Sequence, residues 1–454
     1  MIGNIGSRLF GFLVTIYLAR VLDVTGFGKL QFSLAIFSYG LILTNPGLLL
    51  LGTREVAREK EKIGEFLPAL VGLRTFFALL SFLSILILLF FLPKPEETKT
   101  LILLYSLTLF SQGFLLEWLF QGMEEMEPVG LSRVSLFLVY LPLTFFFVKG
   151  PEEIFRVPLF FFAGNLTSTL LLITVFLRRH GKVRLQFNPS LLLPLLKKSL
   201  PLGLATMMIQ IYLYFDTLLL GLFKGDEDVG FYNAAYKLVF FVLILDRVFT
   251  ETLFPLITRL YKESQERLEN LLKRYARWII ALVLPIGVGG TLLASSIMIL
   301  LYGPEYEKGI IVFQILVWMV TLSSINSVYG FGLIGCDREK FYTMVITVGT
   351  AVNILLNLLM IPLFGGVGAA LTILFSEGIM FVMMILRFER IVKVQFWKYL
   401  PKPLLASITM GGLIHLLRDL HPLLLVPFGC FVYIALLLLL KGIALEEILL
   451  WRKG

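Results

Sequence analysis

The chain has 454 residues, of which 58% are hydrophobic and only 16% are charged, with a formal net charge of +9. A soluble domain usually carries about 25% charged residues. This composition excludes an ordinary soluble protein and indicates an integral membrane protein, because its apolar residues form runs of about 20, the length that crosses a hydrocarbon core.

In chain order, the apolar runs predict an all-α fold with about fourteen membrane-spanning helices. The segment from Arg259 to Arg277 alternates charged with apolar residues and predicts an amphipathic helix on the cytoplasmic membrane surface. The spans are expected near residues 2–22, 29–50, 66–92, 100–121, 129–148, 157–177, 200–222, 231–257, 277–301, 309–335, 341–362, 366–387, 402–418 and 423–440.

Basic residues gather in every second connection between these spans. Such asymmetry across short loops fixes orientation, with the basic loops on the cytoplasmic side. We therefore expect a multi-pass protein of the cytoplasmic (inner) membrane with both termini in the cytoplasm. The net positive charge is then explained by topology and lipid contact, so no nucleic-acid partner is predicted.

Weak internal similarity indicates two copies of a six-helix unit. Thr25–Gly28 and Val229–Tyr232 open spans two and eight, and Gln121-Gly122 and Ile334-Gly335 end spans four and ten. Two copies in the same orientation are a recurring plan in transporters. We expect an N-lobe at 1–184, an interfacial linker at 185–199, a C-lobe at 200–390, and spans thirteen and fourteen with a cytoplasmic tail at 391–454.

Arginines inside apolar spans predict a cationic cavity. An ionisable group in hydrocarbon is costly, so it normally faces a cavity or a partner. Arg8 in span one and Arg74 in span three are expected to grip the phosphate oxygens of an anionic lipid head group. The alternative for Arg8 is snorkelling near the inner interface, and for Arg20 snorkelling to the outer surface is preferred over substrate contact.

A second set of charged residues is predicted to act in gating or ion coupling. Asp216 and Lys237 are expected to pair across spans seven and eight, in either a structural or a gating role. Asp246 and Arg247 point about 100° apart on one helix, so at least one of them needs another partner or a cavity. Glu377 either titrates on a pathway for H⁺ or Na⁺ or caps and packs a helix.

The sequence offers little for an enzyme or a metalloprotein. Cys336 and Cys430 lie far apart, the three histidines have no metal-ligand spacing, and no phosphate-binding glycine loop or catalytic triad is apparent. We therefore predict no catalytic residues, no metal and no bound cofactor. Among the helix-breaking residues, Pro285–Gly290 is expected to be a flexible segment.

Several stretches together resemble one family along nearly the whole chain. Glu117-Trp118, followed by Gln121-Gly122, is similar to the ending of the fourth span in Wzx-type polysaccharide flippases of the multidrug/oligosaccharidyl-lipid/polysaccharide exporter superfamily. Further similar stretches are Ser7-Arg8, Ala19-Arg20, Arg54–Arg58, Tyr214–Gly221, Val229–Leu238 and Asn353–Glu377.

The resemblance implies a V-shaped, two-lobed fold with a central cavity. It implies a flippase that moves undecaprenyl-diphosphate-linked oligosaccharide to the outer leaflet by alternating access, for the biosynthesis of polysaccharides such as O-antigen. Membrane lipids and other polysaccharide assembly proteins are the implied partners. The alternatives are a lipid II flippase, although Phe12–Thr15 stand where those proteins carry further basic residues, and a cation-coupled multidrug exporter. A membrane-embedded glycosyltransferase would need a larger outer loop.

Overall fold

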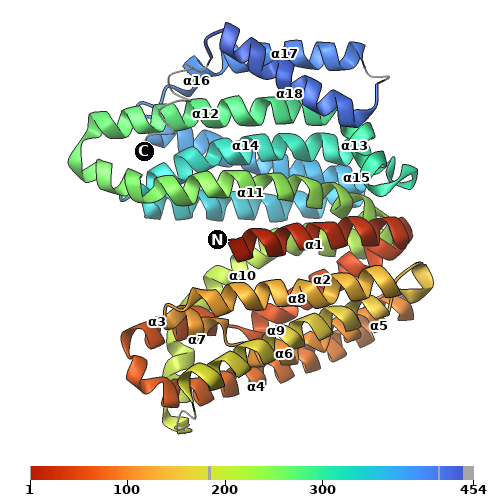
Figure 1. Cartoon of the computed structure of the whole chain (residues 1–454), viewed down its shortest axis with the longest axis vertical. Coiled ribbons are helices and arrows are strands. Elements are labelled where there is room, and N and C mark those ends of the chain that lie inside the picture. The colour runs from red at the N-terminus through yellow and green to blue at the C-terminus, as the bar shows by residue number, and fades with distance from the viewer. Residues whose placement is uncertain (1, 182–185, 418–419, 443–454) are drawn as a thin grey trace. The chain divides into compact units, whose positions relative to one another are not determined.

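The computed structural model describes residues 2–181, 186–417 and 420–442, without the side chains of residues 2–5, 8, 205, 206, 209 and 244–252. Within these ranges the secondary structure is helical, with no strand (Figure 1). The first ten α-helices are α1 (Ile2–Val21), α2 (Asp23–Thr44), α3 (Leu48–Arg58), α4 (Ile63–Phe91), α5 (Glu96–Ser106), α6 (Thr108–Phe114), α7 (Glu117–Gly122), α8 (Met126–Phe147), α9 (Arg156–His180) and α10 (Leu192–Phe223).

The remaining α-helices are α11 (Asp226–Glu263), α12 (Gln265–Leu292), α13 (Ala294–Tyr302), α14 (Gly309–Gly335), α15 (Glu339–Phe388), α16 (Phe396–Tyr399), α17 (Pro401–Leu416) and α18 (Pro422–Leu439). In the described part of the chain, nine helical stretches are long and apolar enough to span a membrane, and α15 is kinked at Gly365 between two predicted spans. Each of the fourteen predicted spans falls on a helix or a broken helix, so the predicted all-α membrane fold is confirmed.

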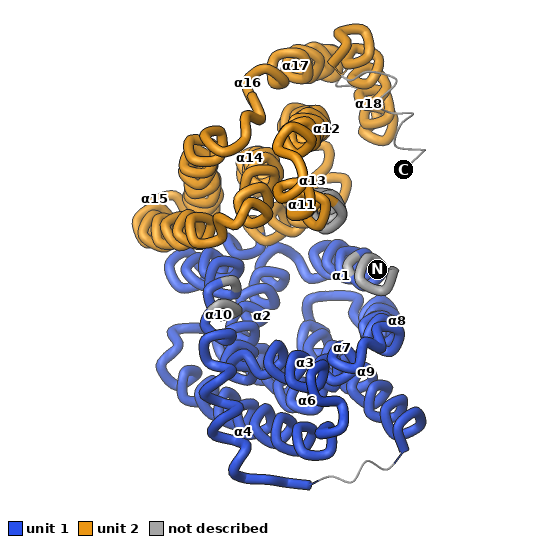
Figure 2. The backbone as a smooth tube through the Cα atoms, turned by 90° about the vertical axis from the view of Figure 1, so that its left-hand side faces the viewer, with its two compact units in different colours: residues 1–230 blue, residues 231–454 orange. Residues whose placement is uncertain are grey.

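The chain forms two compact units, residues 1–230 and 231–454 (Figure 2). In the first unit α2 packs against α4, α5 and α10, α3 packs against α7, and α8 packs against α1 and α9. In the second unit α14 packs against α12 and α15, and α17 packs against α12 and α18. Helix α10, predicted as the first helix of the C-lobe, contacts α2 and α3 of the first unit. The predicted lobe limits, the V shape and the central cavity stay predictions.

The internal repeat has a local structural counterpart in each unit. A Cβ atom on Gly122, at the end of α7, would lie 2.8 Å from a backbone oxygen of α3, and one on Gly335, at the end of α14, would lie 2.6 Å from a side chain of α11. Two residues after each glycine, Glu124 and Asp337 have positive φ angles of 67° and 56°. The same turn therefore ends the corresponding helix in both units.

Helix breaks in the first unit place backbone polar groups in its interior. Asn45, Pro46 and Gly47 separate α2 from α3, and Gly47 has a φ of +81° that favours glycine. A Cβ atom on Gly47 would lie 2.2 Å from the backbone oxygen of Ser199, so α10 crosses closely at this break. A second break separates α6 from α7, and both breaks lie at the same pocket.

One sequence expectation in the second unit is wrong. The predicted surface helix, Arg259–Arg277, is not a separate element. It consists of the end of α11 and the start of α12, which meet at Ser264. Its apolar residues Leu268 and Leu272 are fully buried in a core shared with α14 and α15, because both helices continue beyond their apolar segments and pack there. Helix α12 runs through Pro285–Gly290 without a break, and the predicted flexibility of this segment stays a prediction.

Candidate functional site

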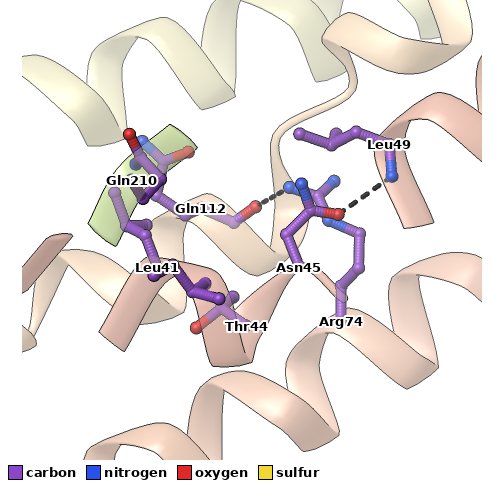
Figure 3. Close-up of a pocket in the computed structure, with 8 residues that line it drawn as sticks. Leu41, Thr44, Asn45, Leu49, Arg74, Gln112 and Gln210 are labelled. Carbon is purple, nitrogen blue, oxygen red and sulfur yellow. Dashed lines mark hydrogen bonds between the residues drawn. The ribbon is translucent and has the colours of Figure 1, made fainter. Parts of the chain in front are cut away.

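The first unit contains a polar pocket at its two helix breaks. The pocket has a volume of about 340 Å³. Figure 3 draws its lining residues, which come from α2, α3, α4, α6, α10 and the α2–α3 break. The lining consists of Leu41, Ile42, Thr44, Asn45, Leu49, Arg74, Gln112 and Gln210. One guanidinium and three side-chain amides thus share a pocket inside a membrane-embedded unit.

Arg74 is the buried cation of this pocket. It is the twelfth residue of the 29-residue helix α4, and only 2% of its surface is exposed. Its Nη1 donates to the backbone oxygen of Leu115 at 2.6 Å. Its Nη2 donates to the backbone oxygen of Gln112, as Figure 3 shows. These carbonyls lie at the end of α6, where the regular α-helical hydrogen bonds stop. The carbonyl of Gln112 also accepts from the backbone N–H of Leu115 at 3.3 Å. Within the described part of the chain, Arg74 has no carboxylate within ion-pair distance, and its Nε has no hydrogen-bond partner.

The amide side chains of the pocket are held by its own elements. Asn45 Oδ1 accepts from the backbone N–H of Leu49 at 2.9 Å, which caps the start of α3 (Figure 3). Gln112 Nε2 donates to Asn165 Oδ1 at 2.7 Å, which fixes the side chain against α9. Gln210 enters from α10 and completes the lining. The arrangement presents neutral donors and acceptors beside one positive charge.

The motif that resembles polysaccharide flippases is structural in this fold. Glu117 accepts hydrogen bonds from Arg133 Nε, at 3.0 Å to Oε1 and 3.3 Å to Oε2, and from Arg133 Nη2 at 2.7 Å, which ties α7 to α8. Trp118 is 1% exposed and packs in the core of the first unit against α3 and α4. Gly122 permits the close approach to α3, and Gln121 is half-buried beside it.

The other predicted cavity residues do not gather at this pocket. The side chains of Arg8, Asp246 and Arg247 lie outside the described residues. Arg20 is exposed in the last turn of α1, and it is not among the residues that line the pocket.

The predicted gating residues lie in both units. Asp216 is buried on α10 in the first unit, whereas Lys237 is half-buried on α11 in the second, so the predicted pair stays a prediction. Glu377 is buried in the second unit on the second half of α15. Its Oε2 accepts a hydrogen bond from Asn326 Nδ2 of α14 at 2.7 Å.

Sequence reasoning missed the pocket amides and a buried ion pair. Lys94 Nζ lies 2.5 Å from Asp226 Oδ1, with side chains only 6% and 8% exposed, and Thr98 donates to the same carboxylate. This pair holds the first turn of α11 against α5. The sequence Asn45-Pro46-Gly47 could have indicated the pocket, because it places an amide beside two helix breakers in an apolar run.

Comparison with known proteins identifies relatives in sequence and in fold. A protein of Escherichia coli (strain K12) described as "Putative O-antigen transporter" is 25% identical over 390 residues, which cover 82% of this chain and 90% of that protein. A protein of Haloferax volcanii described as "Probable low-salt glycan biosynthesis flippase Agl15" is 24% identical over 169 residues, 37% of this chain and 36% of that protein. The solved structure "Lipid II flippase MurJ, inward closed conformation" has the same fold, with a TM-score of 0.74, 16% identity and coverage of 96% of this chain and 97% of that chain.

The family profile described as polysaccharide biosynthesis protein matches residues 1–261, which include α1 to α10, the whole Arg74 pocket and the Glu117–Gly122 motif. The match covers more than half of the chain. The chain therefore belongs to the polysaccharide biosynthesis protein family, as its resemblance to Wzx-type flippases predicted.

Proposed function

We propose that this protein is a flippase for a lipid-linked oligosaccharide in polysaccharide biosynthesis. It works by alternating access in the cytoplasmic membrane, with both termini in the cytoplasm, and it makes or breaks no covalent bond. The proposed substrate is an oligosaccharide on undecaprenyl diphosphate. The names of the Escherichia coli and Haloferax volcanii relatives support a glycan substrate, and the family match supports a role in polysaccharide assembly.

The observation that carries this proposal is the polar pocket around Arg74. A saccharide head group cannot cross hydrocarbon without losing its hydrogen bonds to water, at a cost of several kcal/mol for each unpaired polar group. A pocket that offers amides inside the membrane-embedded unit replaces part of that hydration. The buried guanidinium favours an anionic substrate nearby, because no carboxylate contacts it among the described residues.

The remaining predicted residues receive roles in the same cycle. Arg8 is the proposed direct contact for the diphosphate, and Arg74 supplies a second positive charge. Asp216, Lys237, Asp246 and Arg247 are proposed to act in gating. Glu377, buried beside Asn326, is the proposed site that responds to H⁺ or Na⁺. Membrane potential is a sufficient alternative source of work, since one charge crossing 100 mV is worth about 2.3 kcal/mol.

The test is complementation of a bacterial strain that lacks its own polysaccharide flippase, with surface glycan measured on gels. The parent protein is expected to restore glycan, and Arg74→Ala is expected to lose it while the amount of inserted protein is followed through a fluorescent fusion. Gln314→Ala is the matched control, because Gln314 is a partly buried glutamine in the second unit that bonds a backbone oxygen.

Absence of glycan in several glycan backgrounds, with correctly inserted parent protein, contradicts the flippase proposal. Resistance to toxic cations in the same cells would instead support a drug exporter. Restored glycan with normal yield in Arg74→Ala would leave the flippase intact and remove Arg74 from its mechanism.

A further inference from the structure

We propose that the pocket beside Arg74 is a subsite for one sugar ring of the transported glycan, and that the amides of Asn45, Gln112 and Gln210 determine which sugar it accepts. The proposal rests on the proposed function, since it names the part of the lipid-linked substrate that this site binds. It assigns the pocket to the saccharide and places the diphosphate elsewhere.

The unused hydrogen-bonding atoms of the pocket match sugar hydroxyl groups. Asn45 uses its Oδ1 on α3, which leaves its Nδ2 hydrogens as donors. Gln112 uses Nε2 on Asn165, which leaves Oε1 as an acceptor. Gln210 has no partner within the described part of the chain, so it offers both kinds of atom. A hydroxyl group donates one hydrogen bond and accepts others, so it pairs with this mixed set.

The same atoms fit a phosphate group poorly. A phosphate has acceptor oxygens and is recognised by the paired N–H groups of an arginine fork. Each Nη atom of Arg74 already donates one hydrogen bond, to the carbonyl of Gln112 or of Leu115, and only 2% of the residue is exposed. Its remaining N–H groups therefore present little surface to a phosphate. The free amide oxygen of Gln112 would also repel the negative charge. Arg74 is therefore a positioning residue, which shapes the pocket by holding the end of α6.

The size and the apolar side of the pocket also fit one sugar ring. A volume of about 340 Å³ lies at the lower end of the roughly 300–1,000 Å³ that small-molecule pockets occupy. Leu41, Ile42 and Leu49 give the pocket an apolar wall beside its amides. A pyranose ring has the same division, with C–H groups on its faces and hydroxyl groups around its edge.

The experiment measures sugar binding to the purified full-length protein in lipid nanodiscs by saturation-transfer NMR. The probes are the methyl glycosides of glucose, galactose, N-acetylglucosamine and glucuronic acid, with inorganic pyrophosphate as a competitor. We expect at least one glycoside to bind, and Gln210→Ala to weaken that glycoside about fivefold or more, because each lost hydrogen bond leaves a polar group unpaired. Gln314→Ala is expected to bind like the parent, and pyrophosphate is expected not to displace the glycoside.

Asn45→Ala is a second variant, and its thermal unfolding is measured because it also removes the cap of α3. Three results overturn the subsite. In the first, no glycoside binds to the parent. In the second, glycoside binding is unchanged in both Gln210→Ala and folded Asn45→Ala. In the third, pyrophosphate displaces the glycoside, which would make the pocket an anion site.

Failure of the subsite and failure of the proposed function give different results. Restored glycan in complementation, together with no glycoside binding, rejects the subsite alone. Glycoside binding that depends on Gln210, together with no restored glycan in any background, supports the subsite and rejects the flippase assignment.

Discussion

Replacing Arg74 tests whether its guanidinium holds the break between α6 and α7. Arg74→Met removes both donors to the carbonyls of Gln112 and Leu115, whereas Arg74→Lys keeps the charge without the planar fork. Each charged hydrogen bond is worth about 1.5–3 kcal/mol, and the loss is partly offset because methionine buries no charge. We expect a net destabilisation of about 2 kcal/mol for Arg74→Met and a smaller one for Arg74→Lys.

The assay is thermal unfolding of the purified full-length protein in detergent, followed by size-exclusion chromatography of a fluorescent fusion. For a unit of 230 residues, 2 kcal/mol corresponds to a fall in Tm of about 4–8 °C. Arg54→Met is the matched control, because Arg54 is an arginine on α3 whose side chain is 42% exposed, and it is expected to stay near the parent Tm. An unchanged Tm in Arg74→Met would refute the argument that these carbonyls depend on Arg74.

Three further predictions concern packing and charge elsewhere in the chain. Gly28→Ala is expected to reduce the yield of folded protein strongly, because its Cβ would lie 1.7 Å from the backbone oxygen of Asp226, whereas Gly130→Ala, with no neighbour within 4 Å, is expected to fold normally. Lys94→Met is expected to destabilise the protein by about 3–5 kcal/mol, because it leaves the buried carboxylate of Asp226 unpaired. In a double-mutant cycle with Asp226→Leu, the double variant should lose much less free energy of unfolding than the two single variants lose together. The backbone N–H of Lys149 donates to Glu153 and lowers the pKa of its carboxyl group. Glu153→Gln should therefore lower the Tm slightly at neutral pH, and the difference in Tm should disappear as the pH falls through the lowered pKa.

The sequence predicts the fold well where one physical signal dominates. Apolar runs locate the spans, because the hydrocarbon core fixes their length and composition. The two Gly-containing helix ends at Gly122 and Gly335 identify the repeat, because each must approach another helix closely and is followed by the same turn. The surface-helix prediction fails at Leu268 and Leu272 because hydrophobic periodicity does not distinguish a membrane surface from a protein core as the burial partner.

The site is predicted less completely, because its members come from separate elements. Arg74 is an evident candidate from the sequence, since an arginine in the middle of an apolar span needs a polar environment. Its bonds to two backbone carbonyls depend on where α6 ends, and no local pattern marks that end. Gln112 and Gln210 are single polar residues in long apolar spans, and only the folded structure brings them together with Asn45.

The helix breaks and the buried polar groups of the first unit depend on each other. Without Arg74 the carbonyl of Leu115 would lose the side-chain donor that it has at the end of α6, and without that end Arg74 would lose both of its carbonyl acceptors. The second unit has a similar helix-ending turn, but its buried ionisable group at the α14–α15 contact is Glu377, which bonds Asn326. The first unit thus buries the guanidinium of Arg74 as well as the carboxylate of Asp216, whereas the second unit buries the carboxylate of Glu377. The two roles that we propose, glycan binding beside Arg74 and a response to H⁺ or Na⁺ at Glu377, therefore fall in different units, and each can be tested by substitutions that leave the other unit unchanged.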